Sequence, residues 1–119
     1  MTPREGYEEI GENYDDVLDR LVSEAIIVRF NQKFLNVSDY GDLLHSLEEK
    51  KYRDAFRAAH NLKGLSLNLG FTKLSEAATE ICEELRGGEP VRDLEPMAAA
   101  LKSEYEKVIR MIQDMKSDE

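Results

Sequence analysis

The side chains with the clearest chemical potential lie in one short stretch, residues 58–71, which reads AAHNLKGLSLNLGF. His60 supplies an imidazole, and Lys63 supplies an ammonium group three residues later. Residues three apart on a helix are neighbours on its surface, so both groups can act on one bound group. A neutral imidazole has a ring nitrogen that is free to act as a nucleophile near neutral pH. Once a phosphoryl group is attached, the ammonium can pair with its oxygens.

The spacing of apolar residues predicts that this stretch belongs to a helix over residues 52–69. At roughly 100° per residue, its apolar side chains share one broad face, as expected of a helix packed in a bundle. His60 and Gly64 point elsewhere, and Leu67 lies one turn beyond Gly64, near the direction of His60. The imidazole is therefore predicted to meet solvent. The stripe expected to face the core consists of Tyr52, Ala55, Phe56, Ala59, Leu62, Ser66 and Leu69.

Gly64 is unexpected in the interior of a helix, where glycine costs about 1 kcal/mol relative to alanine. Because it lacks a Cβ, the surface of another macromolecule can come close to the imidazole one turn away. Leu67 adds an exposed apolar side chain, the sort of anchor that docking surfaces use. Arg53 and Arg57 form a local basic patch with Lys63, which favours a partner with an anionic docking face or reacting group.

The pattern H-x-x-K-G-x-x-x-x-x-G, formed by His60, Lys63, Gly64 and Gly70, resembles the signature of histidine-containing phosphotransfer (HPt) domains. The likeness extends over roughly residues 10–115. It implies that His60 accepts a phosphoryl group from the phospho-aspartate of a receiver domain and passes it to another receiver in a multistep two-component phosphorelay. Lys63 would stabilise the phosphoryl group. The resemblance and the helical plot together assign partner access and docking to Gly64, Leu67, Arg53 and Arg57. Phe56, from the core-facing stripe, is added to these docking residues.

The same resemblance implies the partners, which are response regulator receiver domains and a hybrid sensor histidine kinase. The catalytic aspartate and Mg²⁺ would belong to the receiver, so the chain is expected to need no cofactor and to hold no metal. It contains no glycine-rich phosphate loop or kinase motif, so phosphorylation of itself from ATP is not expected. We expect a monomeric, cytoplasmic signalling intermediate rather than an enzyme.

One position departs from the family pattern. Family members often hold the imidazole with a glutamine or similar polar residue on the next helix. Folding the chain back at Gly70 brings Thr79, Cys82 and Glu83 near His60, and none of these is glutamine. Glu83 is a candidate substitute, and its charge would raise the pKa of the imidazole.

Composition excludes several other classes of function. The 119 residues form one expected domain over residues 1–119, long enough to bury a core without disulfides. The net charge of −9 argues against nucleic acid or an anionic membrane as the main partner. No apolar run approaches the roughly 20 residues of a membrane span, and the acidic start is not expected to act as a secretory signal. The single cysteine, Cys82, suits a reducing cytoplasm.

The periodicity predicts an all-α fold, an antiparallel up-and-down four-helix bundle with an additional N-terminal helical segment. No segment alternates with period two, so no strand is expected. Residues 1–10 are expected to be loosely ordered, with Tyr7 and Ile10 available to pin a short turn. Ser23 either caps a new helix or lies within one that continues from Tyr14. Helical spacing is expected from Tyr14 to Leu35, with or without a division at Ser23, and over residues 38–50 and 52–69. Two more helices are expected, one capped by Thr72 that stops at Gly87 and one capped by Asp93 that runs to Met115.

Two other functions use the same architecture. A structural adaptor would keep the bundle without phosphate chemistry, and the intact His60 and Lys63 count against it. A di-iron oxidoreductase needs two Glu-x-x-His pairs and two further glutamates aimed inward. Residue 57, three before His60, is arginine, and only Asp42-x-x-His45 approaches that pattern. We therefore interpret His45 as a surface or half-buried residue.

Overall fold

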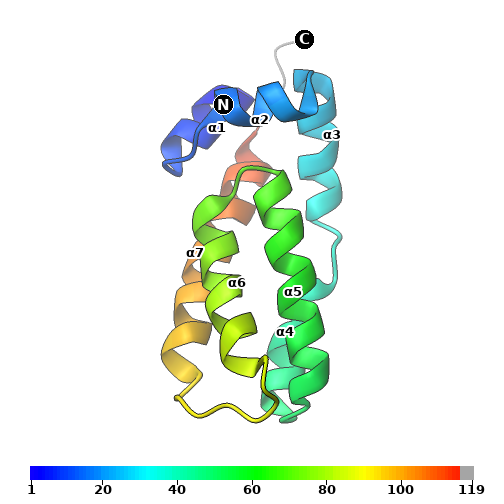
Figure 1. Cartoon of the computed structure of the whole chain (residues 1–119). Coiled ribbons are helices and arrows are strands. Elements are labelled where there is room, and N and C mark those ends of the chain that lie inside the picture. Colours follow the sequence, from blue (N-terminus) through cyan, green and yellow to red (C-terminus); the bar gives the residue numbers. More distant parts are fainter. Residues whose placement is uncertain (116–119) are drawn as a thin grey trace.

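The computed structural model describes residues 1–115, and within them every regular element is a helix. Four helices run alternately down and up to form the bundle (Figure 1). They are α4 (Asp39–Glu48), α5 (Tyr52–Asn68), α6 (Thr72–Leu85) and α7 (Glu95–Asp114). The predicted fold class, an up-and-down helical bundle with an N-terminal helical segment, is confirmed. None of the described helices is long and apolar enough to cross a membrane.

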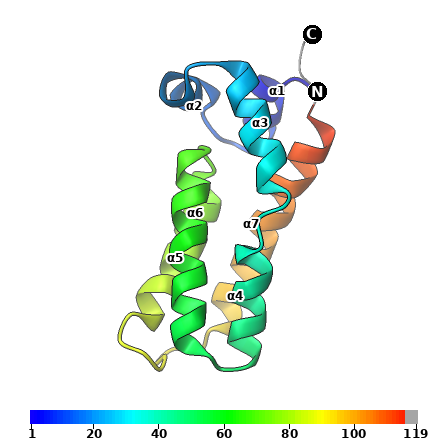
Figure 2. The same cartoon turned by 90° about the vertical axis from the view of Figure 1, so that its right-hand side faces the viewer.

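Three further helices lie over one end of this bundle. Figure 2 shows one of them, α3, above α4, so that the two follow each other along one side of the molecule. The other two cross the top of the bundle beside the end of α5 (Figure 1). These N-terminal elements are α1 (Pro3–Glu9), α2 (Tyr14–Leu21) and α3 (Glu24–Phe34).

The start of the chain is helical, which corrects the prediction that residues 1–10 are loosely ordered. Thr2 and Glu5 form a capping box, in which the Thr2 hydroxyl accepts from the Glu5 amide at 3.1 Å and the Glu5 carboxylate accepts from the Thr2 amide at 2.9 Å. Tyr7 then buries its whole side chain in the core. The Thr-x-x-Glu spacing is a local signal for this helix start, and the burial of Tyr7 is a tertiary effect.

The chain breaks between α2 and α3 at Val22, which has φ 73° and a 79% exposed side chain. The Ser23 amide donates to the Leu21 carbonyl across this residue at 2.9 Å. Ser23 then caps α3, because its hydroxyl accepts from the Ile26 amide at 3.1 Å. Of the two alternatives that the sequence allows, the structure therefore has the new helix.

An aromatic cluster joins the N-terminal helices to the end of the bundle. The Tyr7 ring stacks on Phe71 at 5.5 Å between centroids, and Phe34 meets Phe71 edge-on at 5.5 Å. The Tyr7 hydroxyl donates to the Leu69 carbonyl at 2.7 Å and accepts from the Asn31 amide group at 3.1 Å. These bonds hold α1 and α3 against the C-terminal end of α5.

Gly70 makes the reversal from α5 to α6. Its φ of 79° lies in the left-handed region, and a Cβ there would overlap the Val17 side chain. The Phe71 amide donates to the Ser66 carbonyl at 2.8 Å, as in a helix that ends with a left-handed glycine. The turn thus fixes where α6 begins alongside α5, and it packs against Val17 of α2.

Removing the Tyr7 hydroxyl should weaken this junction. Tyr7→Phe keeps the ring but leaves the buried Leu69 carbonyl without its donor, so the free energy of unfolding in urea should fall by about 1–2 kcal/mol. Tyr52→Phe is the matched control, because Tyr52 is half-buried and its hydroxyl makes no hydrogen bond within residues 1–115. Equal stability of both variants would show that the bonded hydroxyl contributes nothing.

Candidate functional site

α5 separates a core face from a solvent face. Its buried residues include Ala58, which the helical plot did not place in the core-facing stripe. His60 and Gly64 lie on the exposed side, and Leu67 is 55% exposed. The histidine therefore meets solvent, as the plot predicts, in the middle of a helix whose other side builds the core. The buried residues are Ala55, Ala58, Ala59, Leu62 and Ser66.

Lys63 lies half-buried one turn from His60, on the side of α5 that borders α6. Its backbone carbonyl accepts a hydrogen bond from the Ser75 hydroxyl at 3.1 Å, which ties the two helices together beside the motif. Burial raises the pKa of the Cys82 thiol, and the positive charges of Lys63 and Arg86 partly offset this rise. Two cations therefore approach the site from neighbouring helices.

Arg86 is the residue that sequence reasoning missed. It caps α6, and its guanidinium carbon lies over the Phe56 ring, 5.6 Å from the centroid. The Phe56 ring in turn stacks beside the His60 imidazole, with centroids 6.3 Å apart and planes 17° apart. The available signal was its position three residues after Glu83, which puts the two side chains on one helix face.

Glu83, the predicted imidazole partner, is paired with Arg86 instead. Its two carboxylate oxygens accept from the Arg86 Nη2 and Nε at 2.8 and 3.1 Å, and this pairing lowers the pKa of Glu83. The Thr79 hydroxyl donates to the Ser75 carbonyl at 2.7 Å, and Cys82 is fully buried. Within residues 1–115, no hydrogen bond reaches the His60 ring from any of these three neighbours.

The predicted docking residues occupy the same side of α5 over four turns. Arg53 and Arg57 are exposed, and Arg57 lies 4.0 Å from Asp54, which partly neutralises the basic patch. Phe56 is half-buried between this patch and α6. A Cβ built on Gly64 would meet no atom within 4 Å, so the surface beside His60 is open.

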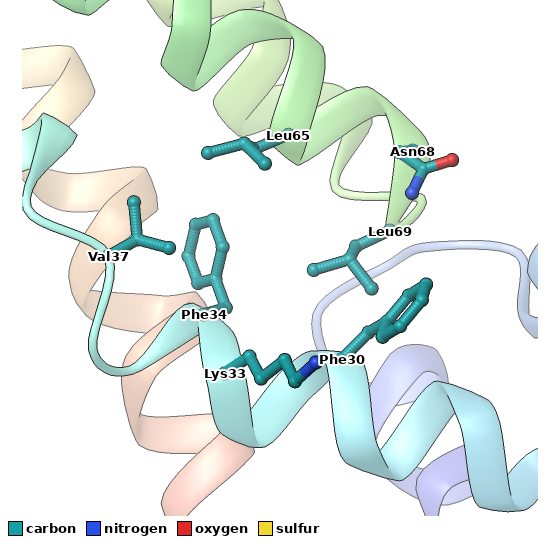
Figure 3. Close-up of a pocket in the computed structure, with 7 residues that line it drawn as sticks. All are labelled: Phe30, Lys33, Phe34, Val37, Leu65, Asn68 and Leu69. Atoms are coloured by element: carbon teal, nitrogen blue, oxygen red, sulfur yellow. The ribbon is translucent and has the colours of Figure 1, made fainter.

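An apolar groove of about 300 Å³ opens between α3 and α5 (Figure 3). In Figure 3 the rings of Phe30 and Phe34 face Leu65 and Leu69 across it. Asn68 lies at its edge and also borders the shallow hollow around Gly64 and Leu67. Asn68 therefore lies between the groove and the exposed side of the motif.

The N-terminal segment supports this end of the motif helix. The Arg20 guanidinium of α2 donates to the carbonyls of Leu67 and Asn68, both at 3.1 Å. Helix C-terminal carbonyls lack partners within their own helix, so a donor from outside stabilises the last turn. The exposed end of α5 is thus held in place by a side chain from 47 residues earlier.

The Asp42-x-x-His45 pair, which approaches a di-iron motif, does not face the bundle interior. Asp42 and His45 are both exposed on α4, and the His45 Nε2 lies 3.9 Å from the Glu49 carboxylate. No group of three or more His, Cys, Asp or Glu side chains in the described part of the chain is arranged to hold a metal ion.

Comparison with known proteins gives a family. The model of the Hpt domain matches residues 30–113, which include α4, α5 and α6, all of α7 but its last residue, and the C-terminal part of α3. The chain is also 31% identical over 99 residues to the chaperone protein ClpB of Leptolyngbya boryana, a match that covers 82% of this chain and 11% of that protein. No solved structure matches the chain significantly.

The family match and the placement of the motif agree. His60 and Gly64 lie on the exposed side of α5 with Lys63 half-buried beside them, and Gly70 ends the helix, all inside the region that the family model covers. Members of this family are phosphotransfer intermediates that interact with receiver domains in phosphorelays, rather than kinases. The chain belongs to the Hpt domain family and has a phosphotransfer-type role.

Proposed function

We propose that His60 accepts a phosphoryl group from the phospho-aspartate of a receiver domain and delivers it to the aspartate of another receiver. The observation that carries the proposal is the position of the imidazole, exposed on α5 with Lys63 one turn along and no side chain at Gly64. A hybrid sensor histidine kinase would supply the phosphate upstream. We further propose that the chain acts as a monomer in the cytoplasm.

The transfer is an in-line displacement at phosphorus. The lone pair of His60 Nε2 forms the new P–N bond while the P–O bond to the receiver aspartate breaks and the aspartate leaves as a carboxylate. The proton on the other ring nitrogen stays in place. The same steps in reverse load the next receiver. Mg²⁺ bound by the receiver would neutralise charge on the phosphoryl oxygens, and the Lys63 ammonium would pair with them on this side.

Docking would place the receiver over the exposed side of α5. The open surface at Gly64 allows its backbone to approach, and Leu67 offers an apolar anchor. The carboxylate-rich pocket of a receiver complements the cations Arg53, Arg57 and Lys63, although the chain as a whole carries −9. Complementary charge of this kind speeds encounter and fixes the orientation of the partners.

Replacing the nucleophile should abolish phosphoryl uptake. His60→Gln keeps a polar side chain of similar size but has no ring nitrogen to attack phosphorus. Incubation with a phosphorylated receiver should give an acid-labile, base-stable phosphate on the unaltered chain and none on the variant. Uptake by the variant would identify another acceptor. Failure of the unaltered chain to take up phosphate from any receiver of its source would favour the structural adaptor.

Gly64 should lower the stability of the folded chain while allowing a receiver to approach His60. Gly64→Ala adds a methyl group into open space and removes a helix glycine, so the free energy of unfolding should rise by about 0.5–1 kcal/mol. Transfer from a receiver should slow by roughly tenfold, because the methyl group displaces the reacting atoms.

Gly41→Ala is the control for Gly64. Gly41 is also an exposed helix glycine with nothing within 4 Å of a built Cβ, but it lies on α4 outside the site. The Gly41→Ala variant should have a higher free energy of unfolding and an unchanged rate of phosphoryl transfer. If Gly64→Ala transfers phosphate as fast as Gly41→Ala, the access role of Gly64 is wrong.

Leu67 should act as a docking anchor. Leu67→Glu places a charge where the receiver would bury an apolar side chain, and the rate of transfer at low receiver concentration should fall about tenfold. Val91→Glu is the matched control, since Val91 is 95% exposed and lies in the connection between α6 and α7. Measured rates that are equal for the two variants would remove Leu67 from the interface.

A further inference from the structure

The orientation of His60 needs a cause that hydrogen bonding does not supply. In-line attack requires the Nε2 lone pair to point at phosphorus. The χ2 angle of an unrestrained histidine has a broad distribution, so the ring needs a restraint. Within residues 1–115 no hydrogen bond holds the ring, because Glu83 is paired with Arg86 and Thr79 bonds its own helix. Packing against a neighbouring side chain is the remaining restraint on the ring.

Phe56 supplies that packing surface. Its ring lies one turn before His60 on α5, nearly parallel to the imidazole at 17° and 6.3 Å between centroids. This separation falls within the range for interacting aromatic rings. Phe56 is half-buried, so its own position is restricted more than that of a free surface side chain.

Arg86 fixes the Phe56 ring from α6. Its guanidinium lies over the ring at 5.6 Å, within the distance of a cation–π interaction. The two bonds to Glu83, at 2.8 and 3.1 Å, hold the planar guanidinium in one orientation. The result is a chain of contacts from Glu83 through Arg86 and Phe56 to His60.

We infer that Phe56 and Arg86 are positioning residues for His60. Arg86, held by Glu83, restrains the Phe56 ring, and the ring holds the imidazole in the orientation from which Nε2 reaches a docked phosphoryl group. Lys63, one turn from His60, is the cation that pairs with the phosphoryl oxygens. We assign Arg86 to act through Phe56, because its guanidinium lies over that ring and Glu83 holds it there by its Nε and Nη2 donors. The inference rests on the proposed role of His60 as phosphoacceptor.

A double-mutant cycle tests this order of action. Phe56→Leu should lower the maximal rate of uptake from a phosphorylated receiver about tenfold with an unchanged half-saturating receiver concentration. Arg86→Gln should lower it about threefold, in line with one exposed cation–π contact. In the double variant, Arg86→Gln should add nothing to the loss caused by Phe56→Leu. Additive losses would mean that Arg86 acts on the phosphoryl group directly and would overturn the inference.

Matched controls separate positioning from general effects of charge or fold. Arg92→Gln removes an arginine that pairs with Glu84 at 2.8 Å, the same length as the Arg86–Glu83 pair, and should leave the rate unchanged. Phe56→Tyr keeps the aromatic ring and should restore the rate lost in Phe56→Leu. Arg86 is 57% exposed, so its variant tests the idea even if Phe56→Leu is too unstable to assay.

A spectroscopic readout keeps this inference distinct from the proposed function. In the unphosphorylated chain, the ring protons of His60 should show a ring-current shift from Phe56 in the NMR spectrum. Phe56→Leu should abolish that shift and Arg86→Gln should reduce it, whether or not His60 accepts phosphate. Unchanged shifts in both variants, together with loss of uptake in His60→Gln, would leave the phosphoacceptor in place and reject the positioning role.

Discussion

The reversal of the chain at Gly70 is the constraint on which the rest of the site depends. Its left-handed backbone, with φ 79°, and its contact with the Val17 side chain admit only a residue without a Cβ. The turn therefore sets the register of α6 against α5. With that register, Arg86 returns to the level of Phe56 and His60, although it lies 26 residues beyond the histidine in the sequence.

Because one side of α5 is exposed, other helices must supply much of the packing and hydrogen bonding that stabilise it. Carbonyls near the C-terminal end of α5 accept hydrogen bonds from Arg20 on α2, Tyr7 on α1 and Ser75 on α6. On the core face, alanines allow the neighbouring helices to approach closely. Stabilisation thus comes from the carbonyls and the buried face, which leaves the solvent side of α5 available for a partner.

The local charge around His60 differs in sign from the charge of the whole chain, which is −9. Lys63 and Arg86 reach the site from α5 and α6, and their charges are felt at the buried Cys82. Arg86 and Glu83 neutralise each other as a pair, so Lys63 is the cation that stays available for an attached anionic group. In the proposed mechanism, Lys63 therefore pairs with the phosphoryl group and Arg86 holds the Phe56 ring.

The sequence by itself determined the motif, the helix that carries it, and the exposed direction of His60, since these follow from local spacing and a period of 3.6 residues. It also indicated the all-α bundle. The helix at residues 3–9, the break at Val22 and the pairing of Glu83 with Arg86 were decided by the tertiary structure. The helix at residues 3–9 needs the pocket that buries Tyr7. At Glu83, His60 and Arg86 are alternative partners for one carboxylate. Local spacing allows the Thr2–Glu5 cap and the Glu83–Arg86 pair, but the burial of Tyr7 and the contact of Arg86 with Phe56 depend on segments that are distant in the sequence.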